Sequence, residues 1–281
     1  MFETISKTDL NRLKNAVNGT QKKFKYSGIF KFINEEFSIG TIANKDILLS
    51  PLDKLNINKI FLKYTNIDLK KDIPDDRLGM SSLNPNEKLA KKSPRDEHIS
   101  LRSFSGTLYI NEQIINILEN SFLTINQRDI ESVEHDYIIV VENLVAFENF
   151  YDLELDKKLN NPLIIYRGDG KSLKATKDFI KRICEKVIVF ADIDPSGFVL
   201  AFSYNPCAIV YPNVSDEIYL KYASKIKYSD QISNITDNLC IQINKSGELR
   251  NIFNQMTNLK AGLQQEQIIS NNMKLHLAMI N

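Results

Sequence analysis

Three carboxylates of the sequence stand where metal-dependent chemistry could be carried out. Glu142 ends the apolar run YIIVVE (137–142), and Asp192 and Asp194 end a second run, KVIVFADID (186–194). Ligands of open parallel sheets bind beyond the carboxyl ends of the strands, and neighbouring strands lie about 4.8 Å apart. In Asp-x-Asp both side chains point to one side of an extended chain. Because hard cations prefer oxygen ligands, we predict that Glu142, Asp192 and Asp194 form a catalytic site for Mg²⁺ or Mn²⁺.

The same residues also fit a structural role. Acids that follow apolar strands often cap the next helix or lie in solvated loops. Pro195 and Gly197 end the second run sharply, and we expect Gly197 to be the glycine of that turn. The amides from Ser196 onward begin a helix whose N-terminus can face an anion such as phosphate. Acids at the ends of two different runs favour a site over two unrelated caps.

Basic residues follow another apolar run, PLIIYRGDG (162–170). Arg167 could hold a phosphate, and Asp169 is more consistent with a turn. Lys171 and Lys174 open the next helix three residues apart, where they could contact a DNA backbone or form a solvated helix face. We carry Arg167, Lys171 and Lys174 forward as candidate DNA-binding residues. Asp216 and Glu217 follow a fourth run, CAIVYP, and are better explained as helix-capping residues than as ligands.

The elements that must position these residues are four apolar runs that alternate with amphipathic helices. Uninterrupted apolar runs are typical of strands buried on both faces of a parallel sheet. We therefore predict an α/β domain over 131–230, with a mainly parallel, Rossmann-like sheet and helices on both faces. The runs are 137–142, 162–170 with its Gly-flanked turn, 186–197 with its acids and Gly/Pro turn, and 207–212, and a helix follows each of them.

The rest of the chain is less regular. Residues 1–70 predict a mainly helical or winged-helix module that binds DNA or a partner, with short helices near 9–17, after Ser27 and near 57–64. Residues 71–130 are predicted to be a linker, rich in charge, Pro, Ser and Asn up to about residue 100, followed by extended pieces and a short helix over 110–120. The segment 231–281 is expected to form C-terminal helices, including one over 265–279.

Bulk properties place few further limits on function. The 281 residues suffice for one large or two modest domains, and a net charge of +1 gives no global attraction to DNA or membrane. The N-terminus has no signal-peptide pattern and no run has the length of a membrane span, so we expect a cytoplasmic protein without membrane contact. Three widely spaced cysteines without a CxxC pair argue against a zinc site or a disulfide framework.

The stretches VVEN (140–143) and FADIDPSG (190–197) resemble the Toprim domain. The second stretch resembles the Asp-x-Asp-Pro-x-Gly signature of the topoisomerase VI A subunit and its relatives. Together with YRGDG, the order of motifs is similar to the Toprim domain of JetD, the nuclease subunit of Wadjet plasmid-defence systems. The resemblance covers roughly 130–225.

The resemblance implies roles for individual residues. Glu142 would be a metal ligand or a general acid–base, Asp192 and Asp194 would be metal ligands, and Gly197 the turn glycine. The implied reaction is metal-dependent phosphodiester cleavage. Asn143 stands where many Toprim proteins have glycine. No tyrosine of the N-terminal region lies in a motif that identifies it as the nucleophile of topoisomerase VI, which favours hydrolysis by water.

The leading hypothesis is a DNA endonuclease or nickase that works in a bacterial defence or DNA-maintenance complex. Its expected partners are DNA, an SMC-like or other ATPase, and a second copy of the chain. The alternatives are a non-catalytic DNA-binding or assembly subunit that keeps a Toprim-like scaffold, and a topoisomerase VI A-like transesterase. The chain has no P-loop, so it is not expected to hydrolyse ATP itself.

Overall fold

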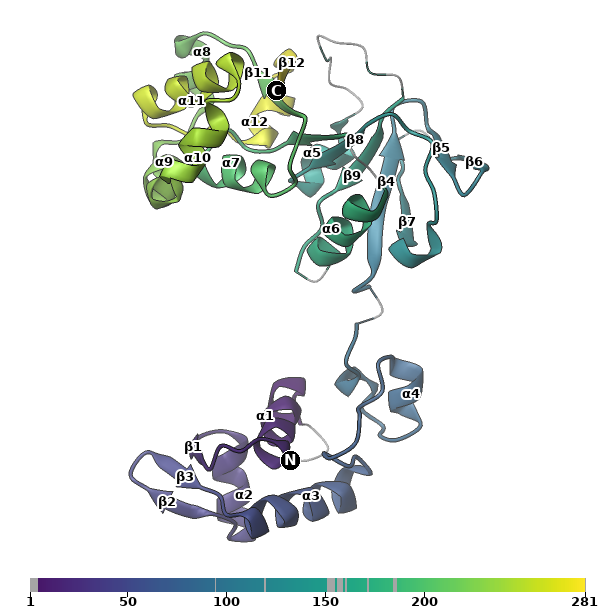
Figure 1. Ribbon diagram of the computed structural model, residues 1–281, viewed down its shortest axis with the longest axis vertical. Helices are drawn as coiled ribbons and strands as arrows, with labels where there is room; N and C mark the ends of the chain where they lie inside the picture. The colour runs from purple at the N-terminus through teal and green to yellow at the C-terminus, as the bar shows by residue number, and fades with distance from the viewer. Residues whose placement is uncertain are drawn as a thin grey trace. The chain divides into compact units, whose positions relative to one another are not determined.

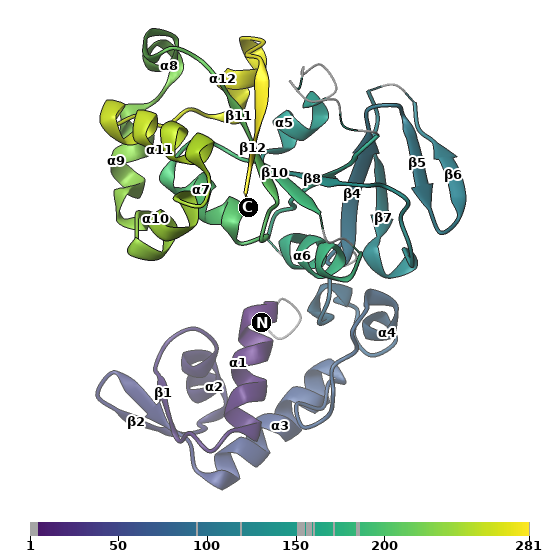
Figure 2. The same ribbon diagram turned by 45° about the horizontal axis from the view of Figure 1, so that its top comes forward.

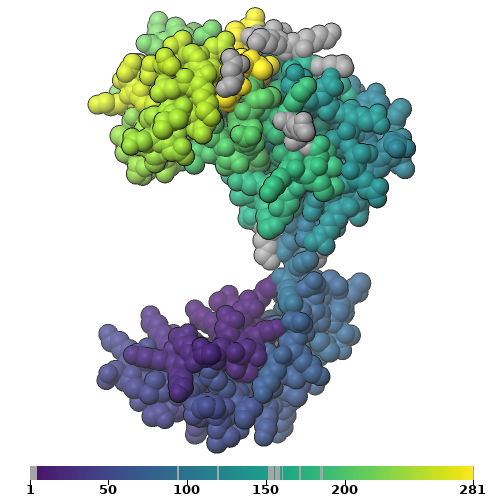
Figure 3. Space-filling model, viewed as in Figure 1, coloured from purple at the N-terminus to yellow at the C-terminus, as the bar shows by residue number. Residues whose placement is uncertain are grey.

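The computed structural model describes residues 5–93, 95–118, 120–150, 155, 159, 161–170, 172–183 and 186–280. The chain divides into two compact units, residues 1–94 and residues 95–281. Figure 1 shows their helices and strands, and Figure 3 gives the same view with all atoms. Each unit has a hydrophobic core of its own, so each is described by itself.

The first unit consists of helices and a small antiparallel sheet of the order β1-β3-β2. The Ser6 side chain accepts from the N–H of Asp9 to cap α1, and Ser50 and Asp53 form a capping box before α3. The helices expected within residues 1–70 are present, and three short strands that the sequence did not predict join them. The elements are α1 (Lys7–Asn18), β1 (Lys23–Lys25), α2 (Ile29–Phe37), β2 (Thr41–Ala43), β3 (Asp46–Leu48) and α3 (Pro51–Thr65).

Residues 71–93 are not the linker that their composition predicted. They form α4 (Arg77–Ser81) and the 3-10 turn η2 (Glu87–Leu89) as part of the first unit. The prediction was wrong because a few apolar residues, widely spaced among charged ones, are enough to anchor a segment whose other side chains face solvent. The anchoring residues lie in the core of this unit: Ile73, Met80, Leu89 and Ala90.

A seven-stranded sheet runs through the second unit in the order β12-β11-β10-β8-β9-β4-β7. The predicted α/β class is confirmed, but the sheet is mixed rather than mainly parallel. Only the four predicted apolar runs are parallel neighbours: β8 (Ile138–Val141), β9 (Leu163–Tyr166), β10 (Val187–Phe190) and β11 (Ala208–Pro212). The other three strands pair antiparallel: β4 (His98–Ser103), β7 (Leu123–Asn126) and β12 (Leu275–Met279).

The direction of travel through the parallel strands reverses between β8 and β10. From β8 the chain crosses to β9 on one side, then returns past β8 to β10 and β11 on the other. In doubly wound sheets ligands bind beyond the carboxyl ends of the two strands at such a reversal, and we call the carboxyl ends of β8 and β10, with the residues that follow them, the crevice. Right-handed crossovers in opposite directions place helices on both faces, as Figure 2 shows for α5 (Leu144–Glu148) and α6 (Ser172–Ile183).

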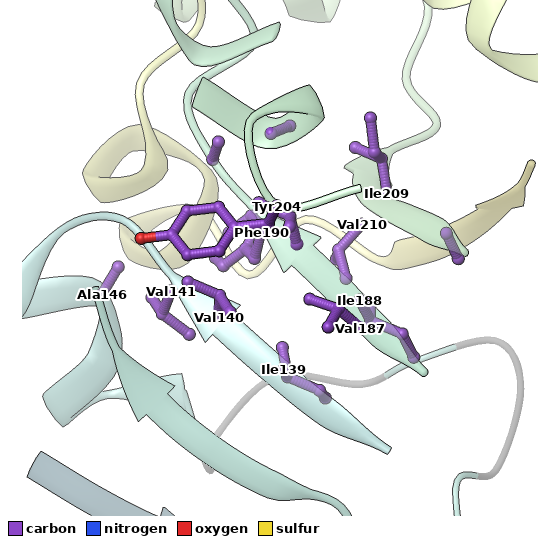
Figure 4. Close-up of a cluster of buried hydrophobic side chains, with 14 of the residues drawn as sticks. Ile139, Val140, Val141, Ala146, Val187, Ile188, Phe190, Tyr204, Ile209 and Val210 are labelled. Carbon is purple, nitrogen blue, oxygen red and sulfur yellow. The ribbon is translucent and has the colours of Figure 1, made fainter. Parts of the chain in front are cut away.

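The core of the second unit lies between this sheet and its helices. Figure 4 shows the part formed by β8, β10 and β11, whose aliphatic side chains pack beside the ring of Tyr204. Tyr204 follows α7 (Pro195–Phe202), the helix that connects β10 to β11. Residues of all three strands are buried apart from Tyr211 near the end of β11. The strands therefore form a dry platform, and polar groups enter only at their ends.

The helix expected over 110–120 is a hairpin instead. β5 (Thr107–Ile110) and β6 (Gln113–Asn116) pair antiparallel around Asn111 and Glu112. Both turn residues have positive φ, of 52° and 60°, as a two-residue type I′ turn requires. Asn tolerates that conformation. The preference of these residues for a turn therefore outweighed the helix-like spacing of the isoleucines, and the segment forms a hairpin.

The C-terminal residues belong to the second unit rather than to a separate group of helices. The helix expected over 265–279 ends at Ser270, and β12 then pairs with β11. None of the helices in the described part of the chain combines the length and hydropathy that a bilayer-spanning segment needs. The helices after β11 are α8 (Asp216–Tyr222), α9 (Lys225–Gln231), α10 (Asp237–Ile243), α11 (Gly247–Leu259) and α12 (Gln265–Ser270).

The packing of α4 gives a direct test. Met80→Ala should destabilise the first unit by about 2–5 kcal/mol, because the Met80 side chain is fully buried. Leu78→Ala on the same helix is the control: Leu78 is 85% exposed, and its loss should change the free energy of unfolding by less than about 0.5 kcal/mol. Urea unfolding followed by circular dichroism measures both, and equal effects would show that residues 71–93 do not pack on this core.

Candidate functional site

Glu142 continues β8 beyond its last strand residue. Its backbone N–H donates to the carbonyl oxygen of Phe190 at 3.0 Å, which extends the parallel pairing of β8 with β10. Oε2 of its carboxylate accepts a hydrogen bond from the backbone N–H of Asp192 at 3.2 Å. The structure thus brings together the two strand ends at the point where the sheet reverses, and Glu142 joins them.

Asp192 and Asp194 follow β10 and have different environments. Oδ1 of Asp192 accepts a hydrogen bond from the backbone N–H of Gln265 at 2.8 Å, which leaves its second oxygen for a ligand. Asp194 is 2% exposed and is the N-cap of α7, with Oδ1 accepting from the N–H of Gly197 at 2.7 Å. The two roles that the sequence allowed for these acids, site residue and helix cap, are therefore divided between them. Asp192 lies beside Glu142, and Asp194 begins a helix.

Gly197 is required by a close approach of two backbone segments. A Cβ at this position would lie 2.0 Å from the carbonyl oxygen of Asp192, a distance that no side chain can occupy. The first turn of α7 can therefore begin directly against the end of β10, and this holds Asp192 and Asp194 at the crevice.

Arg167 lies on the other side of Glu142. Its backbone N–H donates to the carbonyl oxygen of Val141 at 2.9 Å, its Nε donates to the carbonyl oxygen of Glu142 at 2.9 Å, and Nη2 lies 3.9 Å from Oε1 of Glu142. The guanidinium is held by the backbone of β8 and keeps part of its surface exposed, so it could meet an incoming anion. Of the sequence candidates, it is the cation that the structure places against the acids.

The other candidates near β9 are not brought to the crevice. Asp169 accepts a hydrogen bond from the Tyr166 hydroxyl at 2.6 Å and belongs to the turn. Lys174 forms an ion pair with Asp178 one helical turn on, and its side chain is 79% exposed. Its solvated position fits the alternative of a surface helix face. Lys171 lies outside the described residues.

The C-terminal segment completes the crevice, which the sequence did not predict. Ile193 and Leu263 exchange two backbone hydrogen bonds of 2.8 and 3.0 Å. Gly262 lies against Asp194, where a Cβ would be 2.8 Å from the Asp194 Cβ. Residues 262–265 therefore run beside the two aspartates like a short extra strand, and α12 begins next to the site.

Gln265 ties both strand ends together from this segment. It is fully buried. Its Oε1 accepts from the backbone N–H of Asn143 at 2.9 Å, and its Nε2 donates to the carbonyl oxygen of Phe190 at 3.0 Å. With its backbone bond to Asp192, one residue fixes the ends of β8 and β10. The sequence signal was only the polar run QQEQ (264–267), which has the pattern of an exposed helix start.

Glu266 adds a fourth carboxylate. Nδ2 of Asn143 donates to Oε1 of Glu266 at 2.7 Å, while Oδ1 of Asn143 caps α5. Oε2 of Glu266 is buried and has no hydrogen-bond partner among the described residues. A buried oxygen without a donor is costly, so this atom is a place where a cation or a water fits the chemistry of the site.

Tyr204 is a second polar group without a partner near these acids. Its side chain is 7% exposed, and the hydroxyl has no hydrogen-bond partner in the described part of the chain. Figure 4 shows the ring over the carboxyl end of β8, beside Val141 and Ala146. Burial raises the pKa of Tyr204 to about 12, and the charges of Arg167 and Glu142 also act on it. At neutral pH the hydroxyl is therefore protonated and can donate a hydrogen bond.

The carboxylates of the crevice share a high negative charge. Burial raises the pKa of Asp192 to about 7; the N–H of Gln265 opposes this shift, and Glu142, Asp194 and Glu266 add to it. Burial likewise raises the pKa of Glu142, against the N–H of Asp192 and the charge of Arg167. Perturbed carboxyl groups in a crevice are typical of functional sites.

A divalent cation fits this donor set. No three acidic, histidine or cysteine side chains of the described residues are close enough to form a metal site as they stand. Mg²⁺, however, is commonly held by one or two carboxylates together with water and substrate phosphate. Glu142 and Asp192 would hold it, and a cation there would offset the cost of burying their charges, which is the main cause of the raised pKa of both.

Comparison with known families gives a match for this chain. A family model described as a domain of unknown function (DUF7281) matches residues 96–277. The match covers well over half of the chain and includes every site residue described above, so the chain belongs to this family. A comparison with curated proteins found no match.

The raised pKa of Asp192 predicts how stability depends on pH. The pKa is about 7 in the folded chain, against 3.8 for an ordinary aspartate, so the folded state binds this proton more tightly than the unfolded state. The stabilisation is fully present below about pH 4 and is lost as the pH rises to 7, by at most on the order of 4 kcal/mol. Asp192→Asn should therefore gain stability relative to the wild type between pH 4 and pH 8. Urea unfolding in EDTA measures the difference, and a constant difference would refute the shift.

Gln265 should be critical for the site's stability. Gln265→Ala removes two side-chain hydrogen bonds and leaves the part-buried N–H of Asn143 without its partner, while the carbonyl oxygen of Phe190 keeps the N–H of Glu142, at a cost of about 1–3 kcal/mol. Gln264→Ala is the matched control, because the Gln264 side chain makes no capping hydrogen bond to α12 and is only partly buried. Thermal unfolding of both variants tests this; a Gln264 effect as large as that of Gln265 would contradict it.

Proposed function

We propose that this member of the DUF7281 family is a metal-dependent DNA endonuclease or nickase that hydrolyses phosphodiester bonds. The observation that carries the proposal is the meeting of Glu142 and Asp192 at the reversal point of the sheet, with Arg167 against Glu142. Carboxylates that hold a cation and an arginine that can hold a phosphate are the groups that phosphodiester hydrolysis needs.

The resemblance to Toprim domains supports the same reading. The VEN, YRGDG and DIDPSG stretches follow the first, second and third parallel strands. The first and third of these strands are neighbours, so the two motifs that carry the resemblance meet in space. A Toprim-like arrangement of the four parallel strands is therefore part of the proposal.

The residues of the crevice would have different roles in phosphodiester hydrolysis. Glu142 and Asp192 would hold Mg²⁺ or Mn²⁺, which supplies positive charge to the scissile phosphate when bound. Arg167 would orient the phosphate from the side of β9, since its guanidinium is fixed by the backbone of β8. Glu142, whose pKa is raised by burial, could move the proton of the attacking water. Asp194 would act by positioning α7 and the two residues before it.

The first unit and the partners belong to the same proposal. The sheet order β1-β3-β2 beside helices suits a winged-helix-like module that binds DNA or a partner. Cleavage of both strands of a duplex by a single site per chain would require a second copy, and selection of the DNA by an SMC-like ATPase fits the resemblance to JetD.

One observation favours a second candidate, a non-catalytic DNA-binding or assembly subunit. The Asp194 carboxylate is buried and occupied with the N–H of Gly197. If Asp192 and Glu142 were likewise structural, the fold would serve as a scaffold, and divalent ions would not bind at the crevice.

Plasmid cleavage separates the two candidates. In Mg²⁺ or Mn²⁺ the wild type should nick or linearise plasmid DNA, and Asp192→Asn and Glu142→Gln should each reduce the rate by about 10²–10⁴-fold. Asp216→Asn is the control, because Asp216 lies after β11, outside the crevice, and its Oδ1 accepts from Gln255. Equal cleavage by all four proteins would eliminate the proposed site.

A metal titration completes this test. Mn²⁺ should raise the melting temperature of the wild type at pH 7.5, where Asp192 is substantially ionised, and should raise it less at pH 5.5. Asp192→Asn should lose the effect. A wild type whose melting temperature is indifferent to Mn²⁺ at both pH values would support the scaffold candidate.

A further inference from the structure

The two units of the chain carry opposite charge, although the whole chain is nearly neutral. Residues 1–94 contain 17 Lys and Arg against 11 Asp and Glu, a net charge of +6, and residues 95–281 contain 19 against 24, a net charge of −5. Nucleic-acid affinity comes mainly from cations that neutralise phosphates. The unit with the acidic crevice is therefore poorly suited to hold DNA by itself, and the first unit is where phosphate contacts are expected.

The first unit has a cleft whose lining combines cations and aromatic rings. Its volume is about 580 Å³, within the range of small-molecule sites and too small for a duplex. β1 is an edge strand, so side chains from both of its faces can reach the cleft. The lining residues that matter here are Arg12, Lys23, Lys25, Phe24 and Phe30.

The cations of this cleft are not fully neutralised by the protein. Lys23 Nζ lies 3.1 Å from a carboxylate oxygen of Asp46. Arg12 Nη1 is 3.7 Å from a carboxylate oxygen of Asp9, and the Arg12 side chain is 55% exposed. Lys25 is exposed and has no acidic partner within the described part of the chain. Three cations face the cleft with one acid, Asp46, among its lining residues.

The aromatic rings give the cleft a second property. Phe24 stacks on Phe30, with ring centroids 4.9 Å apart and an angle of 26° between the planes. Phe30 is 5% exposed and anchored in the core, while Phe24 is only half-buried. A ring supported from below and open at the cleft is the kind of surface on which an unpaired base stacks.

We infer that this cleft binds one unpaired nucleotide of a DNA single strand, with a backbone phosphate on Arg12 and Lys25 and the base on the ring of Phe24. The cleft is small for a base pair, and cations beside an aromatic platform are the features that bind single strands without sequence preference. The inference deepens the proposed function, on which it rests for its biological meaning, by naming DNA with a single-stranded segment as the substrate class.

Binding without cleavage tests the inference. Fluorescence anisotropy of the full chain in EDTA would use a labelled 20-mer of thymidylate and a duplex of the same length. Phe24→Leu should weaken single-strand binding by about 5- to 100-fold and leave duplex binding unchanged. Lys25→Ala should weaken single-strand binding and reduce the slope of log affinity against log salt by about 0.7.

Matched variants keep each outcome decisive. Lys59→Ala removes the same charge from an exposed residue of α3 outside the cleft and should have little effect. Phe24→Tyr keeps the ring and should retain binding, which separates stacking from a folding defect of Phe24→Leu. Wild-type-like binding by Phe24→Leu, an equal loss in Lys59→Ala, or no single-strand binding by the wild type would each overturn the inference. Failure of the plasmid assay with intact, Phe24-dependent binding would instead reject the proposed nuclease and leave the cleft standing.

Discussion

The concentration of negative charge at the ends of β8 and β10 is the constraint on which the arrangement of the second unit depends. Parallel pairing brings Glu142 beside the residues after Phe190, and the dry strands behind them offer no polar partner. Burial and mutual repulsion raise the pKa of Asp192 and Glu142. Such a group of acids persists only if the surrounding backbone donates to each carboxylate, and the N–H groups of Asp192, Gly197 and Gln265 do so.

This requirement explains why the chain returns to the site after leaving it. The segment 262–265 pairs with Ile193, and Gln265 bonds to both strand ends. β12 then continues into the edge of the same sheet beside β11. The C-terminal residues are thus part of the crevice and of the sheet. The second unit cannot be divided at residue 230 without removing the donors that hold the acids in place.

The distribution of charge gives the two units complementary properties. The acids at the ends of β8 and β10 belong to a unit with a net negative charge, whereas the first unit has an excess of positive charge and a cleft with an aromatic platform. In the proposed function, the first unit would contact the nucleic acid and the second unit would hold the metal. Under this proposal, different substitutions would alter the affinity for DNA and the cleavage of DNA.

The amino-acid sequence was enough to predict many of the local elements and the two acids at the ends of β8 and β10. Uninterrupted apolar runs fixed the four parallel strands, because a strand buried on both faces has no room for polar residues, and the acids that end those runs marked Glu142 and Asp192. Local patterns did not reveal that residues 71–93 pack on a core or that 110–120 turns as a hairpin, since a few anchoring side chains and one Asn-containing turn decided these segments. Gln265, Glu266 and Tyr204 were decided only by the tertiary structure. Their contacts with the strand ends join residues as far as 123 positions apart, and a polar side chain that will be buried against a distant backbone has the same local signature as one that faces water.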